Sequence, residues 1–127
     1  GAVVHAHSRF ATTVSCLGQD LPAVHYMLAA AGTSRVRCAP YAVFGSAELA
    51  AAAVAAVGDS RACLLGNHGL VAAGADLAEA LRVAAEVEAV AEYWWRARAV
   101  GTPAILTEEE MAEAIRRFRT YGVDAGR

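Results

Sequence analysis

The chain has 127 residues, enough for one domain around one core, and a formal net charge of −2 at pH 7. Its 57% hydrophobic residues exclude a disordered chain, and its weak negative charge excludes a protein that binds polyanions such as nucleic acid through a basic surface. The sequence shows no signal-peptide pattern and no run of about 20 apolar residues that could cross a membrane. Its three cysteines form no CxxC pair and indicate small buried thiols in a reducing compartment. We therefore expect a cytoplasmic protein.

The chain starts at Gly1, without a methionine, and runs directly into an apolar stretch that predicts a strand. A sheet strand needs neighbours on both sides or a protected edge, so a natural domain rarely starts in this way. We expect that an N-terminal portion is missing and that residues 1–127 are a partial domain.

Two histidines end this first predicted strand. In an extended strand, residues two apart point to the same face, about 7 Å apart, so His5 and His7 present their imidazoles side by side. A third, His68, follows the apolar run 62–65 and lies in a tight turn between Asn67 and Gly69. Two strands of one sheet could bring the three rings to one point. Three neutral imidazoles with a fourth position open are typical of a catalytic zinc site, although a half-exposed histidine pair remains an equal alternative on spacing alone.

The segments that follow alternate between helix and strand. Ser8 is expected to cap a helix to about residue 17, and Pro22 opens a segment, 23–31, that predicts a second helix. Residues 36–39, before Pro40, predict a strand. Ser46 is expected to cap an alanine-rich helix that ends near residue 57.

The second half of the chain predicts a hairpin and two helices. Runs 62–65 and 70–73 are strands around the His68 turn, and a capping box at 76–79 starts a helix to about residue 100. Its expected core stripe is Leu77, Leu81, Ala84, Val87, Ala91 and Trp94, with Trp95 pointing elsewhere. A last capping box, at 107–110, starts a helix to about residue 119. This alternation predicts an α/β sandwich around one sheet.

Several segments, taken in order, resemble the class II aldolase/adducin family, and most closely its members that act on L-fuculose 1-phosphate. They are residues 5–8, 22–27, 38–42, 44–45, 67–69 and 118–122. The resemblance implies a three-layer α/β/α sandwich around a central mixed or antiparallel sheet. It also implies a zinc-dependent aldolase that cleaves a ketose 1-phosphate to dihydroxyacetone phosphate and an aldehyde, with zinc as the Lewis acid.

The resemblance assigns roles residue by residue. His5, His7 and His68 match the zinc ligands, one ion per chain. Tyr26 matches a catalytic tyrosine that reaches the site of a neighbouring subunit and exchanges a proton with the aldehyde oxygen. Phe44 and Tyr121 match residues that wall the aldehyde pocket. Members of this type are homotetramers with their sites between subunits.

Two parts of the family's machinery have no match in these residues: a glutamate acid/base and the phosphate-binding loops, both upstream of the first strand in the family. The phosphate-binding residues are therefore unknown. Pentulose-phosphate 4-epimerases and sugar-phosphate dehydratases keep the same three histidines, so both remain alternatives. A non-catalytic, adducin-like interaction module remains a third.

Overall fold

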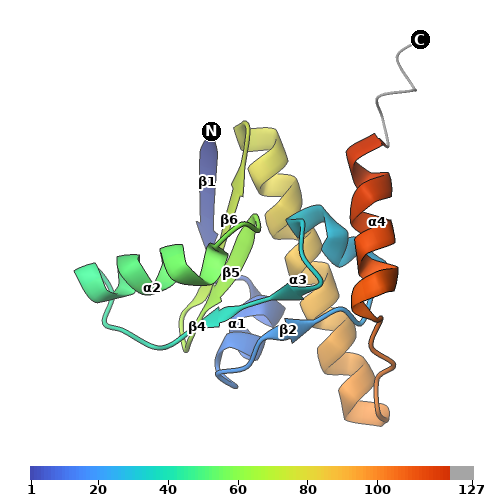
Figure 1. The fold of residues 1–127 in the computed structure, drawn as a ribbon. Coiled ribbons are helices and arrows are strands. Elements are labelled where there is room, and N and C mark those ends of the chain that lie inside the picture. Colours follow the sequence, from blue (N-terminus) through green and yellow to red (C-terminus); the bar gives the residue numbers. More distant parts are fainter. Residues whose placement is uncertain (121–127) are drawn as a thin grey trace.

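A four-stranded mixed sheet lies at the centre of the computed structural model, which describes residues 1–120 (Figure 1). Its strands, in spatial order, are β1 (Ala2–Ala6), β6 (Gly69–Gly74), β5 (Ala62–Leu65) and β4 (Cys38–Ala39). β6 is antiparallel to both neighbours, and β4 is parallel to β5. The predicted mixed sheet and the hairpin around the His68 turn are confirmed.

Helices cover the sheet on both faces and make the predicted three layers. One face packs against α1 (Arg9–Ser15) and α3 (Leu77–Val100), with the 3₁₀ helix η1 (Tyr26–Ala31) and α4 (Glu108–Thr120) next to α3 (Figure 1). The other face packs against α2 (Ala47–Val57). Strand alternation sorts the core accordingly: Leu64 and Leu70 belong to the cluster with α1 and α3, whereas Cys63 and Leu65 belong to the cluster with α2.

The prediction of one strand over residues 36–39 is wrong. The segment divides into β3 (Arg35–Val36), which pairs with β2 (Leu21–Pro22) in a small second sheet, and β4 in the main sheet. At the break, the Asp20 carboxylate accepts a hydrogen bond from the backbone N–H of Cys38 at 2.8 Å. Residues 35–39 therefore contribute a short strand to each of two sheets, and the pattern of apolar residues does not reveal this division.

The segment 23–31 is helical over a shorter range than predicted. Pro22 belongs to β2, so the chain stays extended until His25, whose backbone has φ −144°. The His25 Nδ1 atom then accepts a hydrogen bond from the Met27 N–H at 3.2 Å and caps a single 3₁₀ helix. The α1 helix is also shorter than predicted and ends at Ser15.

The long helix α3 buries a different face at its start from the predicted one. Leu77 is 65% exposed and Leu81 is 58% exposed, so their expected place in the core is wrong. Ala80 is fully buried instead, and its backbone lies so close to Gly74 that a Cβ atom on Gly74 would overlap it. Farther along, the predicted stripe is confirmed, with Ala84, Val87, Ala91 and Trp94 buried.

The cysteines are less uniformly buried than predicted. All three thiols are free: Cys63 is buried, Cys38 is half-buried and Cys16 is exposed.

Within residues 1–120, no helix combines the length and apolar character needed to span a membrane.

Candidate metal centre

The three histidines meet at the end of the sheet where β1 leads into α1. His5 lies on β1 opposite Val71 of β6, His7 follows the strand, and His68 precedes β6 in the connecting turn. The ring centroids of His5 and His7 are 5.0 Å apart, and that of His68 is 4.8 Å from each. One ring nitrogen from each histidine lies within 4.8 Å of the other two. The side chains are thus close enough for one metal ion to bind all three after a small adjustment.

The surroundings of the His5 and His68 rings favour a neutral imidazole, the form that binds a metal ion. The His5 Nδ1 atom lies 2.8 Å from the carbonyl oxygen of Leu70, which can only accept, so Nδ1 carries the proton and Nε2 is left free as a ligand. Burial lowers the pKa of His68, and the neighbouring His5 and His7 lower it further. A neutral imidazole is the state that coordinates a metal ion.

The turn that carries His68 is held by backbone contacts. Asn67 adopts the left-handed conformation, with φ +54°, and the His68 N–H donates to the Leu65 carbonyl at 3.0 Å. Gly69 packs against the Ala6 carbonyl and the His7 ring, where a Cβ atom would collide with both. The close approach of β1 and β6 therefore requires glycine beside the third histidine.

Two residues that the sequence did not single out also support this arrangement. Ser15, at the end of α1, is fully buried and accepts hydrogen bonds from the backbone of Asn67 and His68. Glu88, on α3, accepts hydrogen bonds from two backbone N–H groups at the start of α1. In the sequence, Glu88 stands between the apolar residues Val87 and Ala89, which is only a weak signal of a role. Nothing in the sequence around Ser15 indicates its contacts with the His68 turn.

The donor set fits a divalent ion such as zinc. The group consists of three imidazoles, a ligand set that catalytic zinc sites use. His5 and His7 are exposed, which gives a ligand access from solvent.

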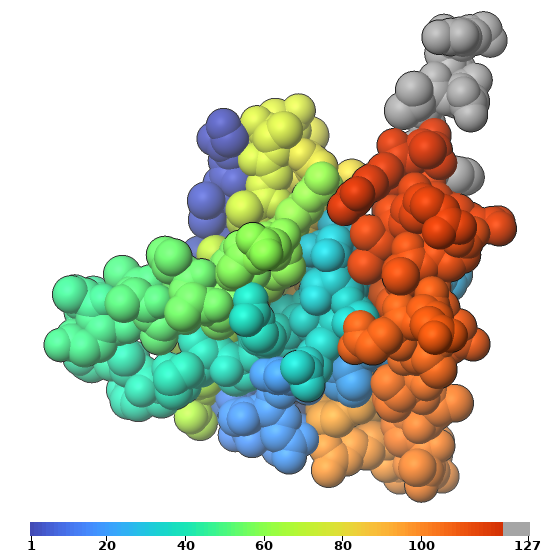
Figure 2. Space-filling view, in the orientation of Figure 1, coloured from blue at the N-terminus to red at the C-terminus, as the bar shows by residue number. Residues whose placement is uncertain are grey.

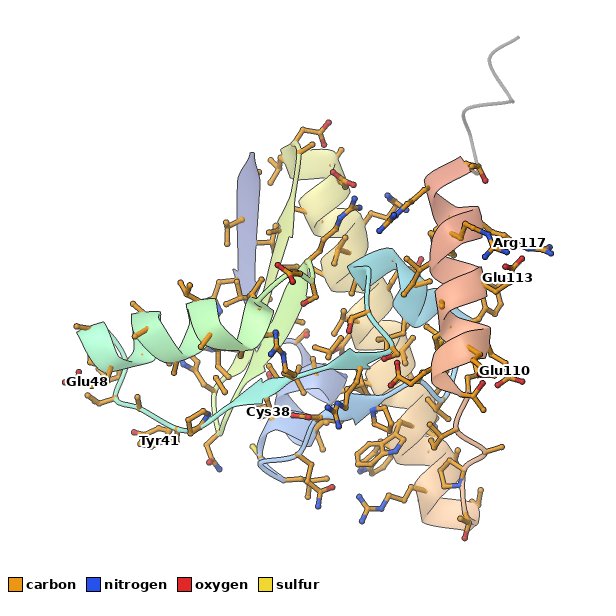
Figure 3. The ribbon with its side chains drawn as sticks, in the orientation of Figure 1. Cys38, Tyr41, Glu48, Glu110, Glu113 and Arg117 are labelled. Atoms are coloured by element: carbon orange, nitrogen blue, oxygen red, sulfur yellow. The ribbon has the colours of Figure 1, made fainter. Side chains whose placement is uncertain are left out.

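Tyr26 lies apart from the histidines, on the side of the molecule that carries α3 and α4. Its ring is 54% exposed and stacks on His25 at a centroid distance of 4.8 Å. It borders an open groove of about 720 Å³ between η1, α3 and α4, whose rim includes Glu110, Glu113 and Arg117 (Figure 3).

Of the two predicted pocket residues, Phe44 and Tyr121, the structure describes only Phe44. Phe44 is 80% exposed in the loop between β4 and α2, near the exposed Tyr41 (Figure 3), and this loop projects with α2 from the rest of the molecule (Figure 2). Within residues 1–120, neither Tyr26 nor Phe44 makes an aromatic contact with the three histidine rings. Tyr121 lies outside the described residues.

Comparison with known proteins points to one family. Residues 1–95 match the sequence profile of the Class II Aldolase and Adducin N-terminal domain. Over 125 residues, the chain is 46% identical to 5-methylthioribulose-1-phosphate/5-deoxyribulose-1-phosphate aldolase from Rhodospirillum rubrum, a match that covers 98% of this chain and 57% of that one. It is 43% identical over 123 residues to L-fuculose phosphate aldolase from Escherichia coli K12, covering 96% and 57%.

A solved structure gives the same result. L-fuculose 1-phosphate aldolase superposes with a TM-score of 0.90 at 41% sequence identity, over 92% of this chain and 55% of that one. The chain therefore spans a little over half the length of the relatives that it matches.

Proposed function

Because the chain belongs to the class II aldolase and adducin family, we propose that it is part of a zinc-dependent aldolase that cleaves a ketose 1-phosphate to dihydroxyacetone phosphate and an aldehyde. The observation that carries the proposal is the convergence of His5, His7 and His68, with the His5 Nε2 atom left free by the Leu70 hydrogen bond. When bound there, zinc supplies a Lewis acid for the oxygens of the hydroxyketone.

The histidine cluster supports a metal-dependent cleavage. Aldol cleavage needs an electron sink for the pair left on carbon when the carbon–carbon bond breaks, and a bound metal ion can serve as one. His5, His7 and His68 form a group that could hold such an ion.

We assign proton transfer at the aldehyde oxygen to the Tyr26 hydroxyl of a neighbouring copy in a homotetramer. In the direction of aldol formation, the Tyr26 hydroxyl gives its proton to the aldehyde oxygen as the C3–C4 bond forms. In cleavage, the tyrosinate takes the proton of the C4 hydroxyl as that bond breaks and the aldehyde carbonyl forms. Tyr26 is half-exposed and separate from the histidines of its own chain, which suits a contribution to a second copy. We expect Tyr26→Phe to lower kcat by about 10²–10⁴-fold while zinc content stays at the wild-type level.

The substrate class follows from what the named relatives share. Methylthioribulose, 5-deoxyribulose and L-fuculose 1-phosphates all lack a hydroxyl at the end remote from the phosphate. We infer a ketose 1-phosphate of this kind, of the L-fuculose 1-phosphate type, whose apolar end lies against Phe44 and Tyr121. The inference places the enzyme in the bacterial cytoplasm, where such sugar phosphates occur.

The test is an assay for dihydroxyacetone phosphate with these three ketose 1-phosphates, made on protein that retains any native sequence flanking residues 1–127. We expect cleavage that a chelator abolishes, that zinc restores and that His68→Ala lacks. Epimerisation at C4 without cleavage would indicate a 4-epimerase, and loss of water without cleavage would indicate a dehydratase; either result would contradict the proposed aldolase activity. Folded wild-type protein that binds no metal would favour an interaction module.

A further inference from the structure

The helix α1 joins the two halves of the metal centre. It begins at Arg9, directly after the segment with His5 and His7, and it ends at Ser15 beside the turn that carries His68. The Ser15 carbonyl accepts a hydrogen bond from the Asn67 N–H at 3.1 Å, and the Ser15 Oγ atom accepts one from the His68 N–H at 3.3 Å. A shift of α1 therefore moves His7 and His68 relative to each other.

The N-terminus of α1 is capped from another helix. Ser8 occupies the N-cap position without a side-chain capping bond, and its hydroxyl is buried with no partner in the described part of the chain. Instead, the two carboxylate oxygens of Glu88 accept the N–H groups of Phe10 at 2.8 Å and Ala11 at 2.7 Å. Both bonds join a carboxylate to the positive end of a helix, which makes them stronger than neutral hydrogen bonds.

Apolar packing between α1 and α3 holds the rest of α1 in place relative to Glu88. Ala11 and Val14 are fully buried in the same core cluster as Val87 and Val90, which flank Glu88 on α3. The short helix is thus fixed to α3 at its first turn by the carboxylate and along its length by apolar contacts. Its last residue then carries the hydrogen bonds to the histidine turn.

We propose that Glu88 is a positioning residue of the metal centre: by capping α1 it holds Ser15, and with it the His68 turn, at the distance from His5 and His7 that a bound ion requires. Glu88 acts through the backbone of α1 and is outside the histidine group itself. The inference rests on the proposed metal-dependent function.

The test compares zinc affinity with stability in matched variants of the full chain. Glu88→Gln keeps the size of the side chain but loses its charge and turns an amide N–H₂ toward a backbone N–H. Ser15→Ala removes the Oγ contact to His68 and leaves the cap in place. We expect both variants to bind zinc about 10–100-fold more weakly in competition with a chelator.

Thr107→Ala is the matched control, because it removes the cap of α4, where the Thr107 Oγ1 atom accepts from the Glu110 N–H at 3.2 Å. It is expected to lower the stability of the metal-free protein and to leave zinc affinity unchanged. If Glu88→Gln lost as much stability as the control and bound zinc as tightly as wild type, Glu88 would have only a structural role, and the inference would be overturned.

A readout without metal separates this inference from the proposed function. In the metal-free protein, Glu88→Gln is expected to speed amide hydrogen exchange at Asn67 and His68 relative to amides in the centre of β5. Unchanged exchange at these two amides would contradict the inference. Wild-type protein that binds no zinc would remove the proposed function and this inference together, whereas tight zinc binding by wild type and every variant would remove this inference alone.

Discussion

Gly69 is the residue at which the two halves of the metal centre touch most closely. A methyl group there would collide with the Ala6 carbonyl and the His7 ring, and backbone cannot move aside as a flexible side chain can. We predict that Gly69→Ala lowers the free energy of unfolding by about 1–3 kcal/mol and weakens zinc binding about tenfold or more.

Gly101→Ala is the control for this substitution, because nothing lies within 4 Å of the added methyl group and the backbone there is extended. It should change the unfolding free energy by less than about 0.5 kcal/mol and leave zinc affinity as it is. Denaturant titration and chelator competition measure both quantities. If Gly69→Ala bound zinc as tightly as wild type, the close contact of Gly69 with Ala6 and His7 would not be needed to position the histidine ligands.

Cys63 makes stability depend on alkaline pH. Burial and, to a smaller extent, the neighbouring Cys38 raise the pKa of its thiol to about 11, from an ordinary value of 9.0, against a lowering effect of Arg37. The folded state thus favours the protonated thiol, so its contribution is complete below pH 9 and is lost as pH rises through 11. We predict a loss of about 2–3 kcal/mol in unfolding free energy over that interval.

The measurement is denaturant unfolding at several pH values between 8 and 11, with Cys63→Ala as the comparison. The variant is expected to show a flatter decline, because it removes the buried thiol that must ionise. Equal slopes in the two proteins would assign the decline to other groups.

Only the local parts of the histidine group could be predicted from spacing. An alternating strand places His5 and His7 on one side, and a glycine-flanked turn carries His68 between two apolar runs. The pairing of β1 with β6 that brings the two parts together is long-range, so spacing leaves it open and the family resemblance indicates it. The cap of α1 could not be predicted, because Phe10 and Glu88 are 78 positions apart and nothing in either segment identifies its partner.

At the scale of elements, α3 keeps one helical period along its length. Ala80, Val83, Val87 and Trp94 are buried at spacings of three, four and seven residues, whereas Leu81 lies about 120° around the helix from Val87 and is exposed, so the expected stripe starts on the wrong side. The division of residues 35–39 between two sheets has a different cause, since pairing partners elsewhere decide it.

This difference between the buried and exposed faces of α3 is measurable. We predict that Val87→Ala, which leaves a cavity, lowers the unfolding free energy by about 2 kcal/mol, whereas Leu81→Ala changes it by less than about 0.5 kcal/mol. Thermal and denaturant unfolding of the two variants give the comparison. A larger loss for Leu81→Ala would mean that the side chain is covered in solution.

For the whole molecule, a metal site built from distant parts of the chain links metal binding to folding. The unfolded chain holds the three histidines apart, so we expect zinc to bind the folded state preferentially and to stabilise it. We predict a gain of about 2.7 kcal/mol in unfolding free energy when free zinc is at 100 times its dissociation constant. A chelator should reverse the gain, and His68→Ala should show none; an equal gain in that variant would place the zinc elsewhere.

The order of strands in the sheet also sets when the metal centre can exist during synthesis. β1 pairs with β6 and not with the strands that follow it sooner, so the His5–Leu70 hydrogen bond joins residues 65 positions apart. Closing so large a loop costs chain entropy before any contact compensates for it, and such pairings form late. During synthesis, His5 and His7 are therefore made well before His68, and the three-histidine group can assemble only once β6 pairs with β1. We expect metal uptake at the proposed site to follow the pairing of β1 with β6.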